Sequence, residues 1–543
     1  MIDRRTFGRG VAAVLGGAAL TALSLSPALT KPAEAQGTLR LGMTLADIPV
    51  SFGQPDQGFE GFRFMGLMLY DALINWDMTA DDKPSALIPG LAESWSVNKD
   101  DPTKWTFNLR KGVKFHDGST FNADAVIFNF DKLLDKDSPQ FSARQGSLVN
   151  FRIPSIKSYK KIDDYTVEFT THEPSGFVPF QLCYILMASP AQWEKTGKDW
   201  NEFGKTPSGT GPWKLAALAP RESVEFVPFK EHWDTSRVPK LDKVIALPIP
   251  DPNARTAALL SGQVDWIEAP APDAIPRIES QGFKMVANVY PHIWSWHLSR
   301  VEGSPWNDIR VRKAANLAID REGIKALLGG YAIPAVGHVT PTDPWFGEPT
   351  FKVKFDPEAA KALLKEAGFS TDNPVNIKAM ISASGSGQML PLQMNEYMQQ
   401  NLADVGIKID FEVTEWNALI DLWRAGAKSP QANGAHVINV SYTTQDPYSA
   451  FTRFMRSDLS APKGVNWGYY DDPEMDALLR TADGAFDPAE RDAILAKVHA
   501  RAVDDAAFIW VVHDVAPRAM TTKVKGYVQS RNWFQSLTSV YME

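Results

Sequence analysis

A histidine and an aspartate stand side by side at the end of the stretch "WTFNLRKGVKFHDG" (105–118). His116 and Asp117 could form a catalytic pair, supply half of a metal site, or lie in a tight turn. The residues before them alternate between apolar and polar, as in a half-buried strand, and Asp117-Gly118 is a strong turn dipeptide. Asn122 is then placed to cap the helix that we expect over "ADAVIFNFDKLL". We therefore interpret His116 and Asp117 as a turn between a strand and a helix.

No other group of reactive side chains has the spacing of a known catalytic centre. The sequence contains neither a phosphate-binding loop of the Gly-rich, Lys-Ser/Thr type nor a G-x-S-x-G elbow. His292 and His297, the closest pair of the nine histidines, stand an odd number of residues apart in a strand-like segment, which puts them on opposite faces. The single cysteine, Cys183, lies in the apolar run "FQLCYILM", where we expect a buried small hydrophobic residue. The sequence therefore predicts no metal, no cofactor and no catalytic role.

The N-terminal residues have the layout of an export signal. Arg4 and Arg5 precede a weakly apolar stretch over residues 11–29, and "AEA" forms a small-residue cleavage motif. The adjacent arginines resemble a twin-arginine signal. We expect residues 1–35 to be removed by cleavage near Ala35 and the protein to reside in a Gram-negative periplasm. The alternative, a retained membrane anchor, is less consistent with the glycines, threonine and serines that dilute the apolar stretch.

The bulk properties restrict the class of protein. The chain has 543 residues, a formal net charge of −8 and 44% hydrophobic residues. Two or three domains are expected, because one core rarely extends beyond about 300 residues. An acidic balance without a basic patch argues against nucleic acid and anionic membranes as partners. Beyond the N-terminal stretch, no apolar run approaches the ~20 residues that span a bilayer.

Expected helices and strands alternate without a fixed repeat. The first part of the chain is rich in strands, helix and strand alternate after Asp308, and strands return after Asp505. This pattern predicts an α/β fold with a largely covered sheet. Because the end of the chain returns to the first half, two or more segments must cross between the halves. We place these crossing segments near 290–296 and 508–514. If they pair with each other, they would form a hinge.

Several segments carry distinct start or turn signals. Asp356, Asp472 and Asp487 each precede a proline, the arrangement of a helix N-cap and a first helical residue. "GPWKLAALAPRESVEFVPF" has two strand-like runs around "APRE" and predicts a hairpin. We also expect a first strand over 38–44, a helix over about 61–73, and a long strand over 282–299 that is interrupted by Pro291.

Five segments resemble those of a known family. They are "LAESWSVNKDDPTKWTFNLRKGVKFHDGSTFNADAVIFNFDKL" (91–133), "GTGPWKL" (209–215), "NARTAALLSGQVDWI" (253–267), "NDIRVRKAANLAID" (307–320) and "YYDDPEMDALL" (469–479). Together they are similar to the family 5 extracellular solute-binding proteins, the dipeptide-, oligopeptide- and nickel-binding class that serves ABC importers.

The resemblance implies a fold and a role. The fold would be a two-lobed, type II periplasmic-binding-protein clamshell, with lobe I over 36–290, an extra subdomain over about 76–204, lobe II over 291–510 and a return to lobe I over 511–543. The role would be to capture a small solute, a peptide by family default, and to deliver it to an inner-membrane ABC permease. We expect a monomer that performs no catalysis.

The stretch "SYTTQDPYSAF" (441–451) bears on the ligand. In peptide-binding relatives, an aspartate shortly before this Asp-Pro pairs with the peptide's α-amino group, and the matching residue here is Thr443. Dipeptide-binding relatives also place an arginine before "VGI", where this chain has Gln388 and Gln393 and no basic residue. A short zwitterionic peptide would lose both partners, and a buried unpaired charge costs several kcal/mol. A neutral sugar-like or an opine-like solute is therefore an alternative to a peptide.

Polar and aromatic side chains around this stretch form our candidate solute site. Asp446 is more typical of the N-cap of a helix at Pro447 than of a ligand-binding group, and each tryptophan singly could belong to the core. The candidates are Thr443, Thr444, Gln445, Asp446, Gln393, Asn466, Trp294, Trp296, Trp416 and Trp467.

Two functions of other classes stay open at this point. An exported hydrolase could use scattered carboxylates on peptides or glycosides. A chaperone-like protein could bind unfolded chains in an open aromatic groove, with broad and weak affinity.

Overall fold

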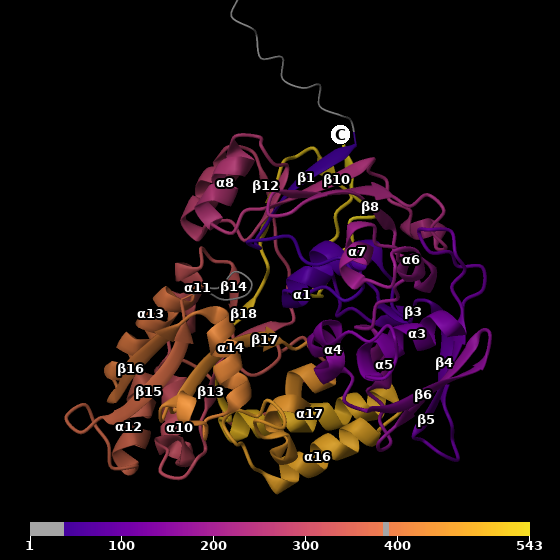
Figure 1. Ribbon diagram of the computed structural model, residues 1–543. Helices are drawn as coiled ribbons and strands as arrows, with labels where there is room; N and C mark the ends of the chain where they lie inside the picture. The colour runs from indigo at the N-terminus through magenta and orange to yellow at the C-terminus, as the bar shows by residue number, and fades with distance from the viewer. Residues whose placement is uncertain (1–36, 384–389) are drawn as a thin grey trace, which may run out of the picture. The chain divides into compact units, whose positions relative to one another are not determined.

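The computed structural model describes residues 37–383 and 390–543. The expected export signal and Gln388 lie outside these residues. Within them, three sheets of seven, six and four strands form the framework, together with two small two-stranded sheets (Figure 1). No helix in the described ranges has the length and apolar character needed to cross a bilayer.

The seven-stranded sheet is built around the first strand. β1 (Thr38–Met43) pairs in parallel with β10 (Lys243–Pro248) and β11 (Trp266–Glu268). The expected hairpin is confirmed, because β8 (Trp213–Ala219) and β9 (Ser223–Pro228) pair antiparallel. The remaining members of this region are β12 (Lys284–Val286), β19 (Arg518–Met520), α8 (Pro252–Leu260) and α9 (Ile275–Ser280).

The four-stranded sheet contains the strand that precedes His116. β5 (Lys104–Leu109) buries Trp105, Phe107 and Leu109, which is the alternation read from the sequence. Asn122 accepts a hydrogen bond from the Ala125 backbone N–H at 3.1 Å, so the expected N-cap is confirmed. The other elements are β4 (Ala92–Val97), β6 (Ile156–Asp163), β7 (Thr166–Thr171), α3 (Ala123–Leu134), α4 (Ala143–Val149), η2 (Asn150–Arg152), α5 (Val178–Leu182), α6 (Pro190–Lys195) and α7 (Trp200–Lys205).

The helix expected over about 61–73 is shorter and irregular. It consists of α1 (Gly58–Gly61), a π-helical turn η1 (Phe62–Gly66) and α2 (Leu67–Leu69), and Tyr70 is already extended. The apolar run continues into β2 (Ile74–Trp76), which pairs with β3 (Leu87–Pro89). The predicted helix extends too far toward the C-terminus, because a fully buried apolar run has no polar–apolar periodicity that would distinguish helix from strand.

Three helices in the part of the chain that forms the six-stranded sheet have the expected Asp-Pro starts. Asp356, Asp472 and Asp487 each accept hydrogen bonds from backbone N–H groups in the first turns of α12 (Pro357–Glu366), α16 (Pro473–Gly484) and α17 (Pro488–Asp504), so all three N-caps are confirmed. The strand order is β14 (Ala332–Pro334), β18 (Phe508–Asp514), β13 (His292–Leu298), β17 (Val437–Thr443), β15 (Val375–Ser382) and β16 (Ile407–Thr414). The other helices named below are α10 (Ile309–Ala318), α11 (Arg321–Leu327), α13 (Pro391–Ala403) and α14 (Trp416–Ala425).

The long strand expected over 282–299 is two strands in two different sheets. β12 belongs to the seven-stranded sheet and β13 to the six-stranded sheet, with Pro291 just before β13. The chain returns from β18 to β19 through residues 515–517, and Figure 1 shows the yellow C-terminal chain leaving β18 and running toward β12. Two short segments, 287–291 and 515–517, therefore join the sheets, and β13 and β18 next to them pair antiparallel.

These two connecting segments are bonded to each other. The Asn288 backbone N–H donates to the Val515 carbonyl at 3.1 Å, and the side-chain amide of Gln529 donates to the carbonyls of Val515 and Ala516. The Asn288 side chain in turn donates to the Gln529 carbonyl at 2.7 Å. The connection is thus a hydrogen-bonded pair of chain segments braced by the C-terminal residues.

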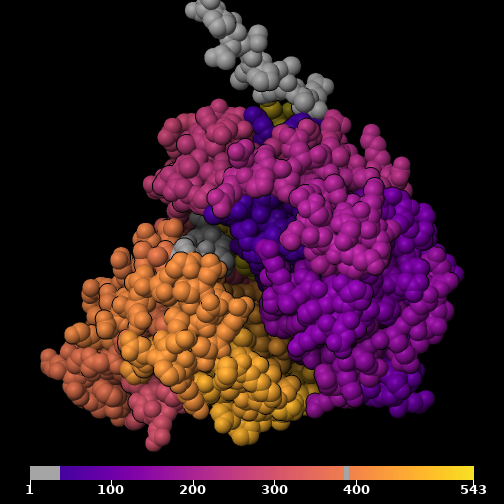
Figure 2. Space-filling model, in the orientation of Figure 1, coloured from indigo at the N-terminus to yellow at the C-terminus, as the bar shows by residue number. Residues whose placement is uncertain are grey.

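A second contact joins α16 to the region of the four-stranded sheet. The Ser175 hydroxyl donates to the Asp483 carboxylate at 2.6 Å, and the rings of Trp105 and Phe486 lie 5.8 Å apart. Figure 2 shows the violet and the yellow-orange surfaces meeting along a seam here. Burial raises the pKa of Asp483 to about 6, although the Ser175 hydrogen bond and Arg456 oppose this shift.

Candidate functional site

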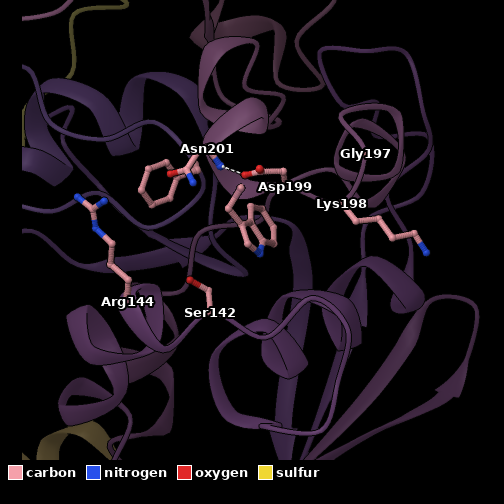
Figure 3. Close-up of a pocket in the computed structure, with 8 residues that line it drawn as sticks. Ser142, Arg144, Gly197, Lys198, Asp199 and Asn201 are labelled. Carbon is pink, nitrogen blue, oxygen red and sulfur yellow. Dashed lines mark hydrogen bonds between the residues drawn. The ribbon is translucent and has the colours of Figure 1, made fainter.

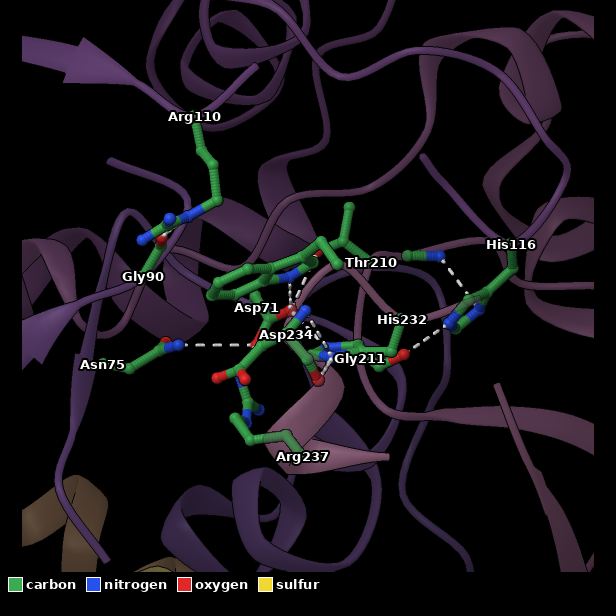
Figure 4. Close-up of polar contacts among 12 residues, drawn as sticks. Asp71, Asn75, Gly90, Arg110, His116, Thr210, Gly211, His232, Asp234 and Arg237 are labelled. Atoms are coloured by element: carbon green, nitrogen blue, oxygen red, sulfur yellow. Dashed lines mark hydrogen bonds and ion pairs between the residues drawn. The ribbon is translucent and has the colours of Figure 1, made fainter. Parts of the chain in front are cut away.

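His116 and Asp117 occupy a structural turn, as the sequence predicts. The Gly209 backbone N–H donates to Nδ1 of His116 at 3.4 Å, so Nε2 carries the proton and donates to the Gly211 carbonyl at 2.9 Å (Figure 4). Asp117 accepts a hydrogen bond from the Ser119 backbone N–H at 2.7 Å. Burial lowers the pKa of His116 to about 4, although the bond to the Gly211 carbonyl opposes this shift, which keeps the ring neutral at physiological pH.

A buried carboxylate near this turn is fully paired. Arg237 donates to one oxygen of Asp71 at 2.7 Å, and the indole of Trp233 donates to the other at 2.9 Å (Figure 4). Burial alone would raise the pKa of Asp71, but the charge of Arg237 and the hydrogen bonds outweigh it and hold this pKa well below its usual range. The remaining partners are Asn75, Thr210 and His232. A carboxylate with this many partners has a structural role.

Other potential reactive groups are dispersed. Cys183 is buried in the core, and its thiol donates a hydrogen bond to the Pro179 carbonyl at 3.4 Å. His292 contacts Trp533, whereas His297 lies among Tyr442, Phe454 and other rings. Among residues 37–383 and 390–543, no group of three or more His, Cys, Asp or Glu side chains could hold a metal ion.

The end of β17 brings four of the candidate site residues together. Thr443 accepts a hydrogen bond from the backbone N–H of Gln445 at 3.1 Å, and the backbone N–H of Thr444 donates to the Pro291 carbonyl at 2.8 Å. Asp446 caps the following turn by accepting from the Ser449 N–H at 2.8 Å. All four side chains are at least nine-tenths buried. They lie directly beside the connection between the sheets.

The other candidates lie elsewhere. Trp294 and Trp296 are on the adjacent strand β13 and are buried in the core, where the indole of Trp296 donates to Asn395 at 2.8 Å. The side chain of Asn466 makes its hydrogen bonds within residues 456–470, and Trp467 is completely buried. Trp416 is half-buried at the start of α14, and Gln393 is exposed on α13. No hydrogen bond or ring contact among the described residues connects these last two side chains to the end of β17.

Side chains that we did not anticipate complete the group at β17. The Tyr184 hydroxyl donates to the second oxygen of Asp446 at 2.8 Å, and the Trp533 backbone N–H donates to Oε1 of Gln445 at 2.8 Å. The ring of Phe59 contacts the rings of both residues, with its centroid 5.8 Å from that of Tyr184 and 5.3 Å from that of Trp533. We call Phe59, Arg152, Tyr184, Gln445, Asp446 and Trp533 the β17 cluster.

Several buried polar atoms of the β17 cluster have no partner. Nε2 of Gln445, Nε1 of Trp533 and two nitrogens of Arg152 form no hydrogen bond within the described part of the chain. An unsatisfied buried donor costs about 1–3 kcal/mol, so such atoms are normally met by water or a ligand. A cavity of about 40 Å³ lies next to Thr444 and Tyr290, on the side of the connecting segment that contains Pro291, and is not lined by the cluster residues.

Both π-helical turns of the described residues flank this cluster. η1 follows Phe59, and η7 (Tyr448–Thr452) follows Asp446. Such turns often occur at functional sites, because they re-aim side chains within a helix. Their positions agree with a binding role for the cluster.

Two larger hollows lie away from β17. One, of about 500 Å³, is lined by Arg144, Lys198, Asp199 and neighbouring residues, and Figure 3 shows Arg144 and Lys198 extending away from each other. Its Asp199 is used as the N-cap of α7. The other, of about 870 Å³, lies beside the start of α16 and includes Arg300 and Lys428.

The model of the bacterial extracellular solute-binding proteins, family 5, matches residues 86–464. The chain belongs to this family. It is therefore the solute-binding component of an ABC importer, of a periplasmic kind, and not an enzyme. The family 5 assignment agrees with the absence of a catalytic constellation among the described residues.

Named relatives support the same assignment. The family 5 chain is 31% identical to the glutathione-binding protein GsiB of Escherichia coli over 425 residues, covering 76% of this chain and 77% of that protein. It is 28% identical to the dipeptide-binding protein of Escherichia coli over 526 residues, covering 91% and 96%. The periplasmic binding protein DppA of Helicobacter pylori, solved with the peptide STSA, shares its fold with a TM-score of 0.76, 23% identity and coverage of 93% and 98%. The fold is thus α/β, as the sequence pattern predicts, and it is the two-lobed type II clamshell that the family resemblance implies.

Proposed function

We propose that this family 5 protein holds its solute at the β17 cluster, between two lobes that close over it. Lobe I would comprise residues 36–290 with the return over 511–543, and lobe II residues 291–510. The single observation that carries this proposal is the convergence of unpaired buried donors, Gln445 Nε2, Trp533 Nε1 and the Arg152 nitrogens, at the junction of the lobes. A solute that accepts these hydrogen bonds would remove their desolvation cost.

Closure would occur at the two connecting segments. Residues 287–291 and 515–517 are short, and Pro291 in the first segment accepts a hydrogen bond from the backbone N–H of the candidate residue Thr444. A hinge made of a few such residues can absorb a rotation between rigid bodies. The solute would shift the equilibrium only to the extent that it binds the closed arrangement better than the open one.

The solute is a peptide by family default, and an opine-like or sugar-like compound is the second candidate. Peptide and glutathione binding are recorded in the names of the two relatives. Thr443 favours the second candidate, because its hydroxyl already accepts the Gln445 N–H and provides no charge for a peptide α-amino group. Thr444, Gln445 and Asp446 would contact either solute, and Trp294 and Trp296 on the adjacent strand β13 would support β17 from the core.

Small-angle scattering tests the closure directly. We expect a smaller radius of gyration when the purified protein is saturated with a solute identified by mass spectrometry of the co-purified material. The co-purified compound should be recovered intact after long incubation, as a cargo is. A radius of gyration that stays constant on saturation with every bound solute would contradict the proposal.

Export and assembly complete the proposal. Residues 1–35 would act as a twin-arginine signal, removed near Ala35, and the mature protein would work as a monomer that delivers its solute to an inner-membrane permease. N-terminal sequencing of the periplasmic protein and analytical ultracentrifugation test these two points. A mature N-terminus far from Gln36, or a stable dimer, would contradict them.

A further inference from the structure

Arg152 lies in an environment that leaves its hydrogen bonds unmade. It ends the short helix η2, and its guanidinium carbon lies 4.1 Å from the ring centre of Phe59 and 5.0 Å from that of Tyr184. Its Nε and Nη1 are buried and have no hydrogen-bond partner among the described residues. Aromatic rings contact the faces of a guanidinium group, whereas its N–H groups point outward in its plane. The missing partner is therefore an acceptor that approaches the edge of the group.

The nearest carboxylate does not fill this place. Both oxygens of Asp446 are engaged, one by the Tyr184 hydroxyl and one by the Ser449 N–H. A second guanidinium group, that of Arg453, also interacts with Asp446. Two half-buried cations, Arg152 and Arg453, are therefore under the electrostatic influence of one carboxylate. Burial lowers the pKa of Arg152 to about 10, so the group keeps its charge at neutral pH.

The neighbouring unpaired atoms are donors as well. Oε1 of Gln445 accepts the Trp533 backbone N–H, which fixes the amide orientation and leaves Nε2 as the free end. Oδ1 of Asn532 likewise accepts the Phe534 N–H, and its Nδ2 is unpaired. Together with Nε1 of Trp533 and the Arg152 edge, the cluster presents N–H groups and an excess positive charge. An anion with several acceptor oxygens complements such a set.

We propose that Arg152 is the residue that selects a carboxylate-bearing solute. This inference rests on the proposed function, and it names the chemical class of the solute as an organic acid or acidic peptide. The carboxylate would accept a hydrogen bond from an in-plane N–H of Arg152, at Nε or at Nη1, and a lysine cannot reproduce this planar donor geometry. Gln445 and Trp533 would then donate to further oxygens of the same solute. Dipeptide-binding relatives place their carboxylate-binding arginine in the stretch around Gln393, where this chain has none. A carboxylate site at Arg152 is consistent with that difference.

Calorimetry with matched acid and ester probes tests the assignment. The probes are glutathione, Met-Leu and succinate, each with the ester that neutralises its carboxylates. We expect the wild-type protein to bind at least one acid more than tenfold tighter than its ester. Arg152→Gln should lose at least tenfold in affinity for that acid and little for the ester, and Arg152→Lys should lie between.

Arg144→Gln is the matched control. Arg144 precedes Arg152 in the same region, but its side chain is 57% exposed and pairs with Asp56 at 3.1 Å. Its loss should leave acid binding unchanged. Thermal unfolding of the unliganded protein should show Arg152→Gln to be close to the wild type in stability, because the lost contacts with Phe59 and Tyr184 are offset by the removal of buried donors that make no hydrogen bond within the described chain. If Arg152→Gln does not fold, a loss of at least threefold in acid affinity in Arg152→Lys supports the assignment, and an unchanged affinity overturns it.

The outcomes separate this inference from the proposed function. Equal binding of acid and ester, or full acid affinity in Arg152→Gln, would overturn the role of Arg152 and leave solute binding by closure intact. Failure of the wild-type protein to bind any acid or ester of the panel would count against both.

Discussion

Two buried polar regions of this protein differ in how completely they are paired. Around Asp71, the carboxylate, the guanidinium of Arg237 and the ring nitrogens of His116 and His232 all have partners. In the β17 cluster, comparable burial accompanies unpaired donors on Arg152, Gln445 and Trp533. Judged by residue type alone, the region around Asp71, with its histidines and aspartate, resembles an active site more than the β17 cluster does.

In these two regions, residue type and completeness of pairing point in opposite directions, and single donors without a partner in the described chain also occur in the core, such as Nε1 of Trp193 and of Trp306. A fully satisfied network stabilises one conformation, whereas unmet donors raise the free energy of the empty site. A ligand that satisfies those donors gains the difference on binding. Four substitutions or conditions test this comparison.

The largest effect is expected from Asp71→Asn. The change leaves Arg237, a quarter exposed, without its carboxylate and should lower the free energy of unfolding by about 3 kcal/mol. Denaturant unfolding measures this loss. The exposed Asp82→Asn should change stability by no more than about 0.5 kcal/mol. A loss below about 1 kcal/mol in Asp71→Asn would show that the network is not a stabilising unit.

Acidification should destabilise the same region through His116. Its pKa is about 4 in the folded protein and 6.5 in the unfolded reference, so the unfolded chain binds the proton first. The contribution of the neutral His116 ring to the free energy of unfolding is therefore fully present above pH 6.5. It is lost as the pH falls toward 4, by up to about 3 kcal/mol. In His116→Gln the pH dependence between 6.5 and 4 should flatten by that amount. An unchanged pH profile would mean that His116 can take up a proton in the fold.

Thr443→Asp should move the β17 cluster toward peptides. A carboxylate at this position can retain the acceptor for the Gln445 N–H and can pair with an α-amino group, which is worth about tenfold in affinity. Calorimetry with Ala-Ala measures the gain, and Thr443→Ser serves as the control without new charge. Unchanged or weaker peptide binding would reject Thr443 as the residue that disfavours peptides.

The smallest change in stability is expected from Trp533→Phe. Nε1 of Trp533 has no partner in the described chain, so its removal should change the free energy of unfolding by less than about 1 kcal/mol while weakening solute binding several-fold. Trp233→Phe is the matched contrast, because the Trp233 indole donates to Asp71 and its loss should cost about 1–2 kcal/mol. Equal destabilisation by both variants would remove the distinction between the two regions.

Local features of the fold were predictable, because their causes lie within a few residues. The N-caps Asn122, Asp356, Asp472 and Asp487 and the β8–β9 hairpin follow from side chains that bond their own or adjacent turns. The stretch over 282–299 was not resolved into two strands, because strand propensity does not say which sheet a strand joins. The early end of the helix at Leu69 was missed for a related reason, since apolar residues suit either a buried helix or a buried strand.

The candidate site was predictable only in part. Thr443 to Asp446 came from one contiguous stretch, and the structure places them together at the junction. Arg152, Tyr184 and Trp533 were missed, because no local pattern marks three residues from distant segments as neighbours. The polar residues of the C-terminal "SRNWFQ" offered the one available signal, since a run of this composition is unusual in a core.

By itself, the sequence determined the local turns and caps, the family and the absence of a catalytic motif, because each of these is written in contiguous residues. Only the tertiary structure decided which buried polar groups are satisfied. Hydrogen bonding is a property of pairs, and in this protein the deciding pairs join residues hundreds of positions apart, such as Tyr184 with Asp446 and Arg63 with Glu268. The way the chain crosses between its sheets decides whether a buried donor meets an acceptor within the protein. A donor without such an acceptor is left to bind a solute.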